Sequence, residues 1–163
     1  MTNPAGAKRQ VIGVFSRAWQ HKMAEVLQLL GSEHAMVVHS DGLDEIRLDA
    51  PTHVVELKNG AITEYDISPS DLGLEPRTDA DLAGIVADSA ASSLALVRQS
   101  LTDDSSAAAD IVALNAGAAI YVSGVANSLS NGVAMAQDAI SSGQAKERLA
   151  ELVRITSLMS ESS

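Results

Sequence analysis

The sequence predicts an α/β domain: a mainly parallel sheet that opens with a βαβ unit, continues into a β-hairpin and is covered by a C-terminal set of helices. Two observations favour this class. Short β-branched runs alternate with a helical pattern early in the chain, and helical patterns fill it from about Ser89 onward. We expect a single α/β domain over residues 1–159 and a frayed tail at 160–163.

The βαβ unit is predicted from three consecutive segments. Residues 9–16, RQVIGVFS, have the composition of a strand, and residues 17–31 carry apolar side chains at helical spacing before Gly31, a typical C-cap. Residues 34–40, HAMVVHS, have the composition of a second, buried strand. Because short connections join the three segments, the two strands should be parallel neighbours in one sheet.

A hairpin is predicted next. Residues 52–68 contain Asn59-Gly60 between two runs of strand formers, which is the signal of a type I′ turn. A two-residue turn at this point places Leu57 opposite Ile62.

The remainder should be irregular at first and then helical. Residues 68–84 are interrupted by Pro and Gly, so we expect an irregular segment with one helical turn. Four helices are expected after them, at residues 92–101, 105–125, 127–143 and 144–159. We interpret Gly117 and Gly124 as small residues that let a buried helix pack close to the sheet, which would leave Asn115 in need of internal hydrogen-bond partners.

Composition limits the function. The formal net charge of −10 disfavours nucleic acid, whose phosphates are bound by clustered Lys and Arg. No segment approaches the ~20 apolar residues of a membrane span, and the N-terminus lacks an apolar signal core, so we expect a soluble, cytoplasmic protein without membrane contact. The chain has no Cys, which excludes disulfides and thiolate metal sites. No Ser/His/Asp arrangement or glycine-rich phosphate loop stands out.

The stretch VVHSDGLDEI, residues 37–46, places Asp41, Asp44 and Glu45 just after the second strand. Open α/β sheets bind ligands at the carboxyl ends of their parallel strands. Adjacent carboxylates point to opposite faces of an extended strand, so they can share a site only if the chain turns, which Gly42 favours. Mg²⁺ takes one or two carboxylates and fills its other positions with water and phosphate oxygens. The stretch is therefore either half of a metal site or an ordinary solvated turn in which Asp44 caps a helical turn.

Histidine adds one further candidate. His39 ends the second strand beside the acidic residues, where it could orient a ligand or act as a general acid or base; the other interpretation is a partly buried supporting residue. His21, His34 and His53 are interpreted as structural or merely exposed.

Four blocks of the chain resemble the carboxyl-terminal half of the anthranilate phosphoribosyltransferase family. They are NPAGAKRQVIGVFS, VVHSDGLDEI, APTHVVELKNGAITEYDISPSDLGL and DIVALNAGAAIYVSG, in the family's order, within a match from Asn3 to about Leu152. The resemblance implies a Mg²⁺-dependent glycosyltransferase that transfers phosphoribosyl from phosphoribosyl pyrophosphate to anthranilate in tryptophan biosynthesis. It also implies a homodimer in the intact enzyme.

The resemblance implies a function for two residues of this chain. Asp44 and Glu45 fall on the family's Asp-Glu metal pair and would hold the Mg²⁺ that engages pyrophosphate. The family's helical domain, glycine-rich loop and phosphoribose-binding residues precede the matching region and are not in this sequence. We therefore expect a missing N-terminal half, no catalysis by this chain alone, no catalytic residue within it, and exposed apolar surface that promotes self-association.

Two other functions stay open. One is a pyrimidine nucleoside phosphorylase-like enzyme of the same fold, which the "GLDE" segment disfavours. The other is a noncatalytic binding or assembly module.

Overall fold

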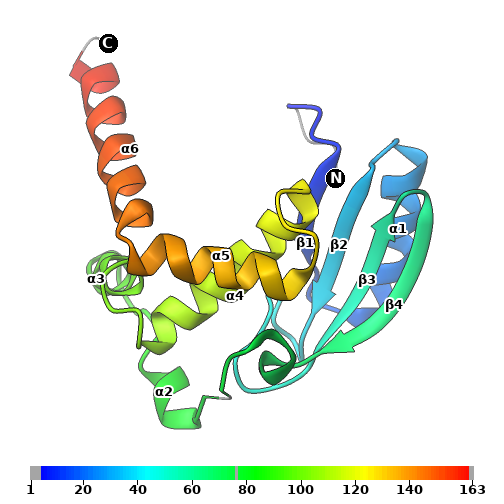
Figure 1. The fold of residues 1–163 in the computed structure, drawn as a ribbon, viewed down its shortest axis with the longest axis horizontal. Helices are drawn as coiled ribbons and strands as arrows, with labels where there is room; N and C mark the ends of the chain where they lie inside the picture. Colours follow the sequence, from blue (N-terminus) through cyan, green and yellow to red (C-terminus); the bar gives the residue numbers. More distant parts are fainter. Residues whose placement is uncertain (1–4, 76, 162–163) are drawn as a thin grey trace.

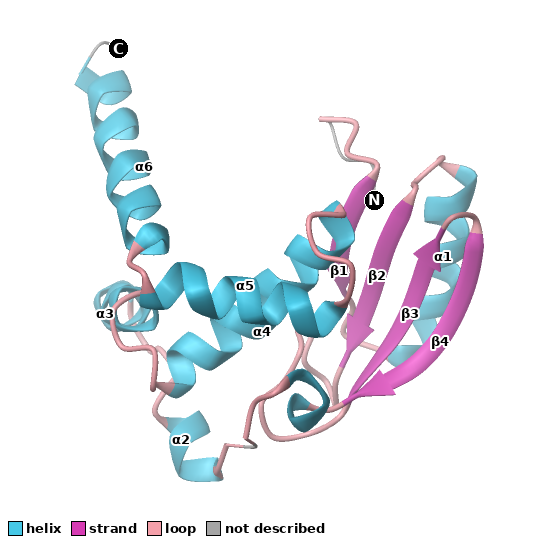
Figure 2. Cartoon of the chain, viewed as in Figure 1, coloured by secondary structure: helices cyan, strands magenta, loops and turns pink. Residues whose placement is uncertain are grey.

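A four-stranded sheet is covered by α1 on one face and by α4 on the other, with α5 packed on α4 (Figures 1 and 2). The computed structural model describes residues 5–75 and 77–161. The strands are β1 (Arg9–Gly13), β2 (His34–His39), β3 (Thr52–Lys58) and β4 (Ala61–Ile67). The helices are α1 (Gln20–Leu29), α2 (Asp79–Ala83), α3 (Ala90–Ser100), α4 (Ala107–Ser123), α5 (Leu129–Ser141) and α6 (Gln144–Glu161), with the 3₁₀ turns η1 (Arg17–Trp19) and η2 (Pro69–Leu72).

The α/β class, the βαβ start and the covering helices are confirmed. The relative direction of the strands in the sheet needs correction. Strand order is β1-β2-β3-β4, and β1 runs parallel to β2 after the α1 crossover. The pairs β2–β3 and β3–β4 are antiparallel, so the sheet is mixed rather than mainly parallel. The reason is the connection over residues 40–51, which contains no helix that could return the chain to the opposite end of the sheet.

The predicted hairpin has the expected turn and register. Asn59 and Gly60 have φ of 53° and 79°, the left-handed conformation that a type I′ turn requires at both positions. Leu57 pairs with Ile62, as the two-residue turn predicts.

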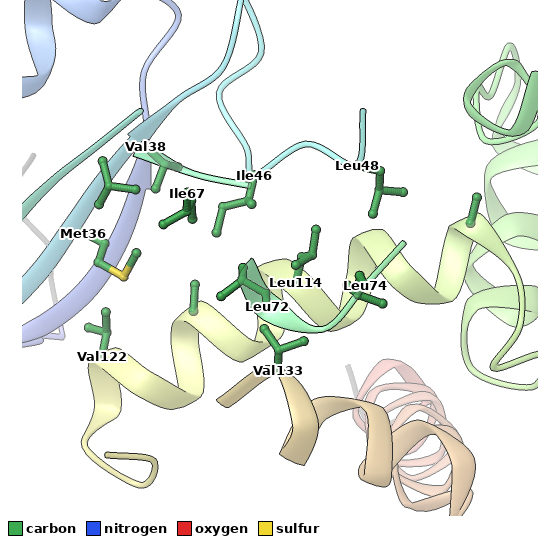
Figure 3. Close-up of a cluster of buried hydrophobic side chains, with 13 residues drawn as sticks. Met36, Val38, Ile46, Leu48, Ile67, Leu72, Leu74, Leu114, Val122 and Val133 are labelled. Atoms are coloured by element: carbon green, nitrogen blue, oxygen red, sulfur yellow. The ribbon is translucent and has the colours of Figure 1, made fainter. Parts of the chain in front are cut away.

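Alternation along the strands places buried side chains in two clusters, one on each face of the sheet, and a third cluster lies between α4 and α5. In β2, Met36 and Val38 join the cluster that includes Leu114 of α4, whereas Ala35 and Val37 face α1. Figure 3 shows Met36 and Val38 beside the α4 side of the core. Successive residues of a strand point to opposite faces, so one buried strand serves both clusters.

Helix α4 approaches α5 so closely that no side chain fits at the crossing. A Cβ atom on Gly117 would lie 2.6 Å from the Cα of Val133, and one on Gly132 would lie 2.3 Å from the Gly117 carbonyl oxygen. The interpretation that Gly117 lets α4 pack against the sheet is therefore corrected: α4 does contact β1 and β2, but the close approach at Gly117 is to α5. Gly124 instead has φ of 86° and caps the end of α4.

We predict that Gly132→Ala lowers the free energy of unfolding by about 3 kcal/mol, at the upper end of ordinary overpacking effects, because the new methyl group meets backbone rather than a movable side chain. Urea denaturation followed by circular dichroism measures the change. Ala134→Ser, which adds one atom at an exposed position of the same helix, should change stability by less than about 0.5 kcal/mol. Equal stability of the two variants would contradict the close crossing.

A buried carboxylate ties α4 to the sheet at the end remote from the acidic residues. Glu56 of β3 accepts hydrogen bonds from the hydroxyls of Tyr65 and Tyr121, each at 2.8 Å, and its Oε1 lies 2.7 Å from Nε2 of His34. Lys58 Nζ donates to the Tyr121 hydroxyl at 2.9 Å. Burial by itself would raise the pKa of Glu56, but the hydrogen bonds from Tyr65, His34 and Tyr121 outweigh it and hold that pKa below its ordinary 4.5.

The sign of the pKa shift gives a pH dependence. Because the pKa of Glu56 is lower in the folded state, its contribution to stability is present above pH 4.5 and is lost as the pH falls through the folded-state pKa. We predict that the stability difference between the native chain and Glu56→Gln shrinks as the pH is lowered from 7 to about 3. Urea titrations at several pH values measure it, and a difference that stays constant with pH would contradict the shift.

The other histidines fit the structural or exposed interpretation. His53 Nδ1 lies 2.8 Å from Oε1 of the buried Gln20, whose Nε2 donates to the carbonyl oxygens of Val37 and His53 at 2.8 Å. Burial lowers the pKa of His53 and favours its neutral form. His21 is exposed and pairs with Glu64 at 2.7 Å.

Helix α6 extends away from α5 into open space (Figure 1). Its exposed apolar side chains include Leu152, Val153 and Ile155, with exposed fractions of 59%, 56% and 42%. Within the described residues, neither this 18-residue helix nor any other has the length and apolarity needed to cross a bilayer. Of the expected tail, residues 160 and 161 belong to α6, and 162–163 lie outside the described residues.

We predict concentration-dependent self-association through α6, because large exposed apolar patches favour burial against another surface. Sedimentation velocity over a range of protein concentrations measures it. Leu152→Lys should weaken the association, whereas Ser157→Lys, which adds the same charge at an exposed polar position of α6, should have a smaller effect. A monomer at all concentrations would contradict the prediction.

Candidate functional site

The acidic loop, residues 40–46, begins where β2 ends. The amide of Ser40 donates to the Leu43 carbonyl oxygen at 3.0 Å, and the amide of Leu43 donates back to Ser40 at 2.9 Å. Asp41 and Gly42 between them have φ of 44° and 86°. This tight left-handed turn at the carboxyl end of a parallel strand confirms the turn expected at Gly42.

The turn brings Asp44 and Glu45 to the surface immediately before a buried segment. Both residues are exposed, whereas Ile46 is 2% exposed and Leu48 is 1% exposed. Figure 3 shows Ile46 and Leu48 inserted into the core above α4. The two carboxylates therefore lie on a solvent-exposed part of the loop, and the next residue, Ile46, is buried in the core.

The Asn115 side chain of α4 binds the backbone of the acidic loop. Its Oδ1 accepts the amide hydrogen of Ile46 at 3.0 Å, and its Nδ2 donates to the carbonyl oxygen of Ile46 at 3.1 Å. The same Nδ2 lies 3.0 Å from the carbonyl oxygen of Ile111, one turn earlier in α4. The expectation that Asn115 finds hydrogen-bond partners inside the protein is confirmed.

Gly13, the last residue of β1, touches the loop backbone directly. A Cβ atom at this position would lie 1.6 Å from the carbonyl oxygen of Asp44 and 2.8 Å from its Cβ. No residue with a side chain fits unless Asp44 or the end of β1 moves. Sequence reasoning missed this contact, and its only signal was a glycine at the end of a strand.

His39 and Asp41 lie beside the pair without joining it. His39 Nδ1 is 2.8 Å from the carbonyl oxygen of Val14, which links the end of β2 to the residue after β1. Asp41 is exposed, with Oδ2 4.0 Å from Nη1 of Arg47. Within residues 5–75 and 77–161, no three His, Asp or Glu side chains converge as a closed metal site would require.

The donor set nevertheless fits an open magnesium site. Carboxylate oxygens are the hard ligands that Mg²⁺ prefers, and this ion commonly keeps several waters while binding one or two carboxylates and the phosphates of a substrate. Because Asp44 and Glu45 are both exposed, an ion that they hold keeps coordination positions free for such oxygens.

A small cavity adjoins the loop, and sequence reasoning did not foresee it. About 260 Å³ in volume, it lies against α3 and α4, and Glu45 contributes to its wall. The remaining lining is mainly apolar, including Leu96, Val97, Ile111 and Val112. The helices that form it are distant from Glu45 in the sequence, so no local pattern indicated it.

Comparison with known proteins places this fold and loop in a family. The family model described as "Glycosyl transferase family, a/b domain" matches residues 1–146. Anthranilate phosphoribosyltransferase of Teredinibacter turnerae is 55% identical over 163 residues, covering 97% of this chain and 47% of that protein. The Marinomonas enzyme of the same name is 56% identical over 159 residues, covering 96% of this chain and 45% of that protein.

Solved structures agree with the sequence comparisons. The crystal structure of anthranilate phosphoribosyltransferase from Thermus thermophilus matches with a TM-score of 0.83 at 38% identity, covering 94% of this chain and 44% of that one. The yeast enzyme in complex with phosphoribosyl pyrophosphate and Mg shares the fold, with a TM-score of 0.72 at 22% identity, covering 87% of this chain and 41% of that one.

The chain belongs to the glycosyl transferase family through its α/β domain. It is similar to anthranilate phosphoribosyltransferases in particular, and it spans about half the length of the curated relatives described above.

Proposed function

We propose that this chain is the carboxyl-terminal part of an anthranilate phosphoribosyltransferase, which transfers phosphoribosyl from phosphoribosyl pyrophosphate to anthranilate in tryptophan biosynthesis. The observation that carries the proposal is the 55% identity to a protein of that name over 97% of the chain. In this proposal residues 1–159 form one α/β domain, the intact enzyme is a cytoplasmic homodimer, and this chain is inactive without the N-terminal half.

In the proposed enzyme, Asp44 and Glu45 hold Mg²⁺. The ion supplies charge neutralisation and a fixed geometry for the pyrophosphate that leaves the sugar. The exposed position of both carboxylates and the hard character of their oxygens support this role. We assign no nucleophile or general base to this chain, so its contribution is to hold the cation and to provide part of the surface on which the substrates meet.

The alternatives have less support. The relatives described above carry the transferase name, which favours the transferase over a pyrimidine nucleoside phosphorylase-like enzyme. A noncatalytic module that binds nucleic acid is disfavoured by the net charge of −10.

We predict that mixing this chain with a separately produced N-terminal half restores anthranilate-dependent consumption of phosphoribosyl pyrophosphate. The combined substitution Asp44→Asn and Glu45→Gln should lower that rate on the order of 100-fold, because charge developing on the leaving group is no longer neutralised. A coupled assay for released pyrophosphate measures the rate in the presence of Mg²⁺.

The matched control removes the same charge from another adjacent pair, through Asp103→Asn and Asp104→Asn, and should leave the rate within about twofold of the native chain if bulk charge is a minor effect. Full activity of the Asp44 and Glu45 double variant would overturn the metal assignment. Consumption that depends on a nucleoside and phosphate instead of anthranilate would favour the phosphorylase.

A further inference from the structure

We propose that Asn115 is a positioning residue for the metal site: it fixes the backbone of the acidic loop so that the carboxylates of Asp44 and Glu45 meet the cation together. This inference rests on the proposed metal role of those two carboxylates. It adds a requirement for a residue in α4, the helix that covers the sheet.

The two carboxylates depend on their backbone for their placement. In the described part of the chain, no hydrogen bond or ion pair involves the side chain of Asp44 or Glu45. Both side chains are exposed, so packing does not fix them either. The path of the main chain through residues 44–46 sets the direction in which each side chain leaves the backbone.

Asn115 controls that path at two points. Its carboxamide offers an acceptor and a donor in one plane, and both go to the same residue, Ile46, at 3.0 and 3.1 Å. The amide of Ile46 belongs to the peptide plane that joins it to Glu45, so the first bond fixes the rotation of that plane. The second bond fixes the following peptide plane, which contains the Ile46 carbonyl group. Together the two hydrogen bonds define the direction of the backbone immediately after Glu45.

Asn115 is itself held in place. Its Nδ2 also lies 3.0 Å from the carbonyl oxygen of Ile111 in the preceding helical turn, which fixes the side chain against α4. We call the two hydrogen bonds from Asn115 to the Ile46 backbone the clamp. Ile46 is buried beside Asn115, so the clamp lies in an environment of low water content where hydrogen bonds are stronger.

Gly13 limits the loop by a second contact. The missing side chain lets the end of β1 lie against the Asp44 backbone, where a Cβ atom would stand 1.6 Å from the carbonyl oxygen. Asp44 is thus confined by β1 and the residue after Glu45 is confined by α4. Supporting residues of this kind typically change metal affinity 10–100-fold when they are removed.

The test uses the 163-residue chain and Mn²⁺ as a paramagnetic substitute for Mg²⁺. Titration with Mn²⁺ should broaden the amide NMR signals of residues 41–46 at lower concentration than those around Asp103 and Asp104. Asn115→Leu keeps the branching and the number of side-chain heavy atoms and removes the three hydrogen bonds, so it should raise the apparent Kd at the acidic loop about tenfold or more. It should also speed hydrogen exchange of the Ile46 amide.

Two further variants separate positioning from loss of stability. Leu57→Ala removes buried methyl groups from the cluster on the α1 side of the sheet, which contains no residue of the acidic loop; it should lower the denaturation midpoint and leave the Mn²⁺ affinity unchanged. Asn115→Ser introduces a hydroxyl that can form a hydrogen bond within α4 but is too short to reach Ile46. This variant should fold and should still show the tenfold rise in the apparent Kd for Mn²⁺.

The outcomes distinguish the inference from the proposed function. If Asp44→Asn with Glu45→Gln binds Mn²⁺ at the loop like the native chain, or if the native chain shows no preference for the loop, the metal assignment fails and the inference fails with it. If the double variant loses binding but both Asn115 variants bind like the native chain, the inference alone is overturned. A loss of Mn²⁺ affinity in Leu57→Ala that matches the loss in Asn115→Leu also overturns it, since lower stability would then explain both.

Discussion

The close crossing of α4 and α5 is the constraint on which the rest of the structure depends. Helix α4 contacts the sheet, α5 and the acidic loop, and it can do so because glycine at positions 117 and 132 brings the two helix backbones into direct contact. A wider crossing would move α4 relative to the sheet or α5 out of the core. The position of Asn115, and with it the backbone of Ile46, follows from that packing.

The elements of the fold were largely predictable because their signals are local. Asn59-Gly60 specifies both the turn and the register of the hairpin, since two residues with positive φ suit one turn type. The direction of β3 relative to β2 follows from the connection over residues 40–51, which lacks the crossover helix that a parallel pair needs, and the composition of the two strands did not indicate it. Likewise, the small size of Gly117 indicated a close contact but could not say whether the sheet or α5 makes it.

In the candidate site, too, the local features were predictable from the sequence and the long-range contacts were not. The turn at Gly42 follows from the residue itself, and the exposed Asp44 and Glu45 follow from the turn. The partners that hold the loop come from elsewhere: Asn115 is 69 positions away from Ile46, and Gly13 reaches Asp44 from the end of β1. A single sequence carries no pattern that pairs such residues, because their contact exists only after the sheet and α4 have assembled.

The clamp on Ile46 also has a consequence for the order of folding. The carboxylates leave the ribosome before the side chain that holds their backbone, because Asn115 follows Ile46 by 69 residues and can act only once α4 has docked. Contacts this distant in the chain form late, because the loop-closure entropy must be overcome first. A growing chain therefore carries the acidic residues for some time without the backbone geometry that the proposed metal site needs.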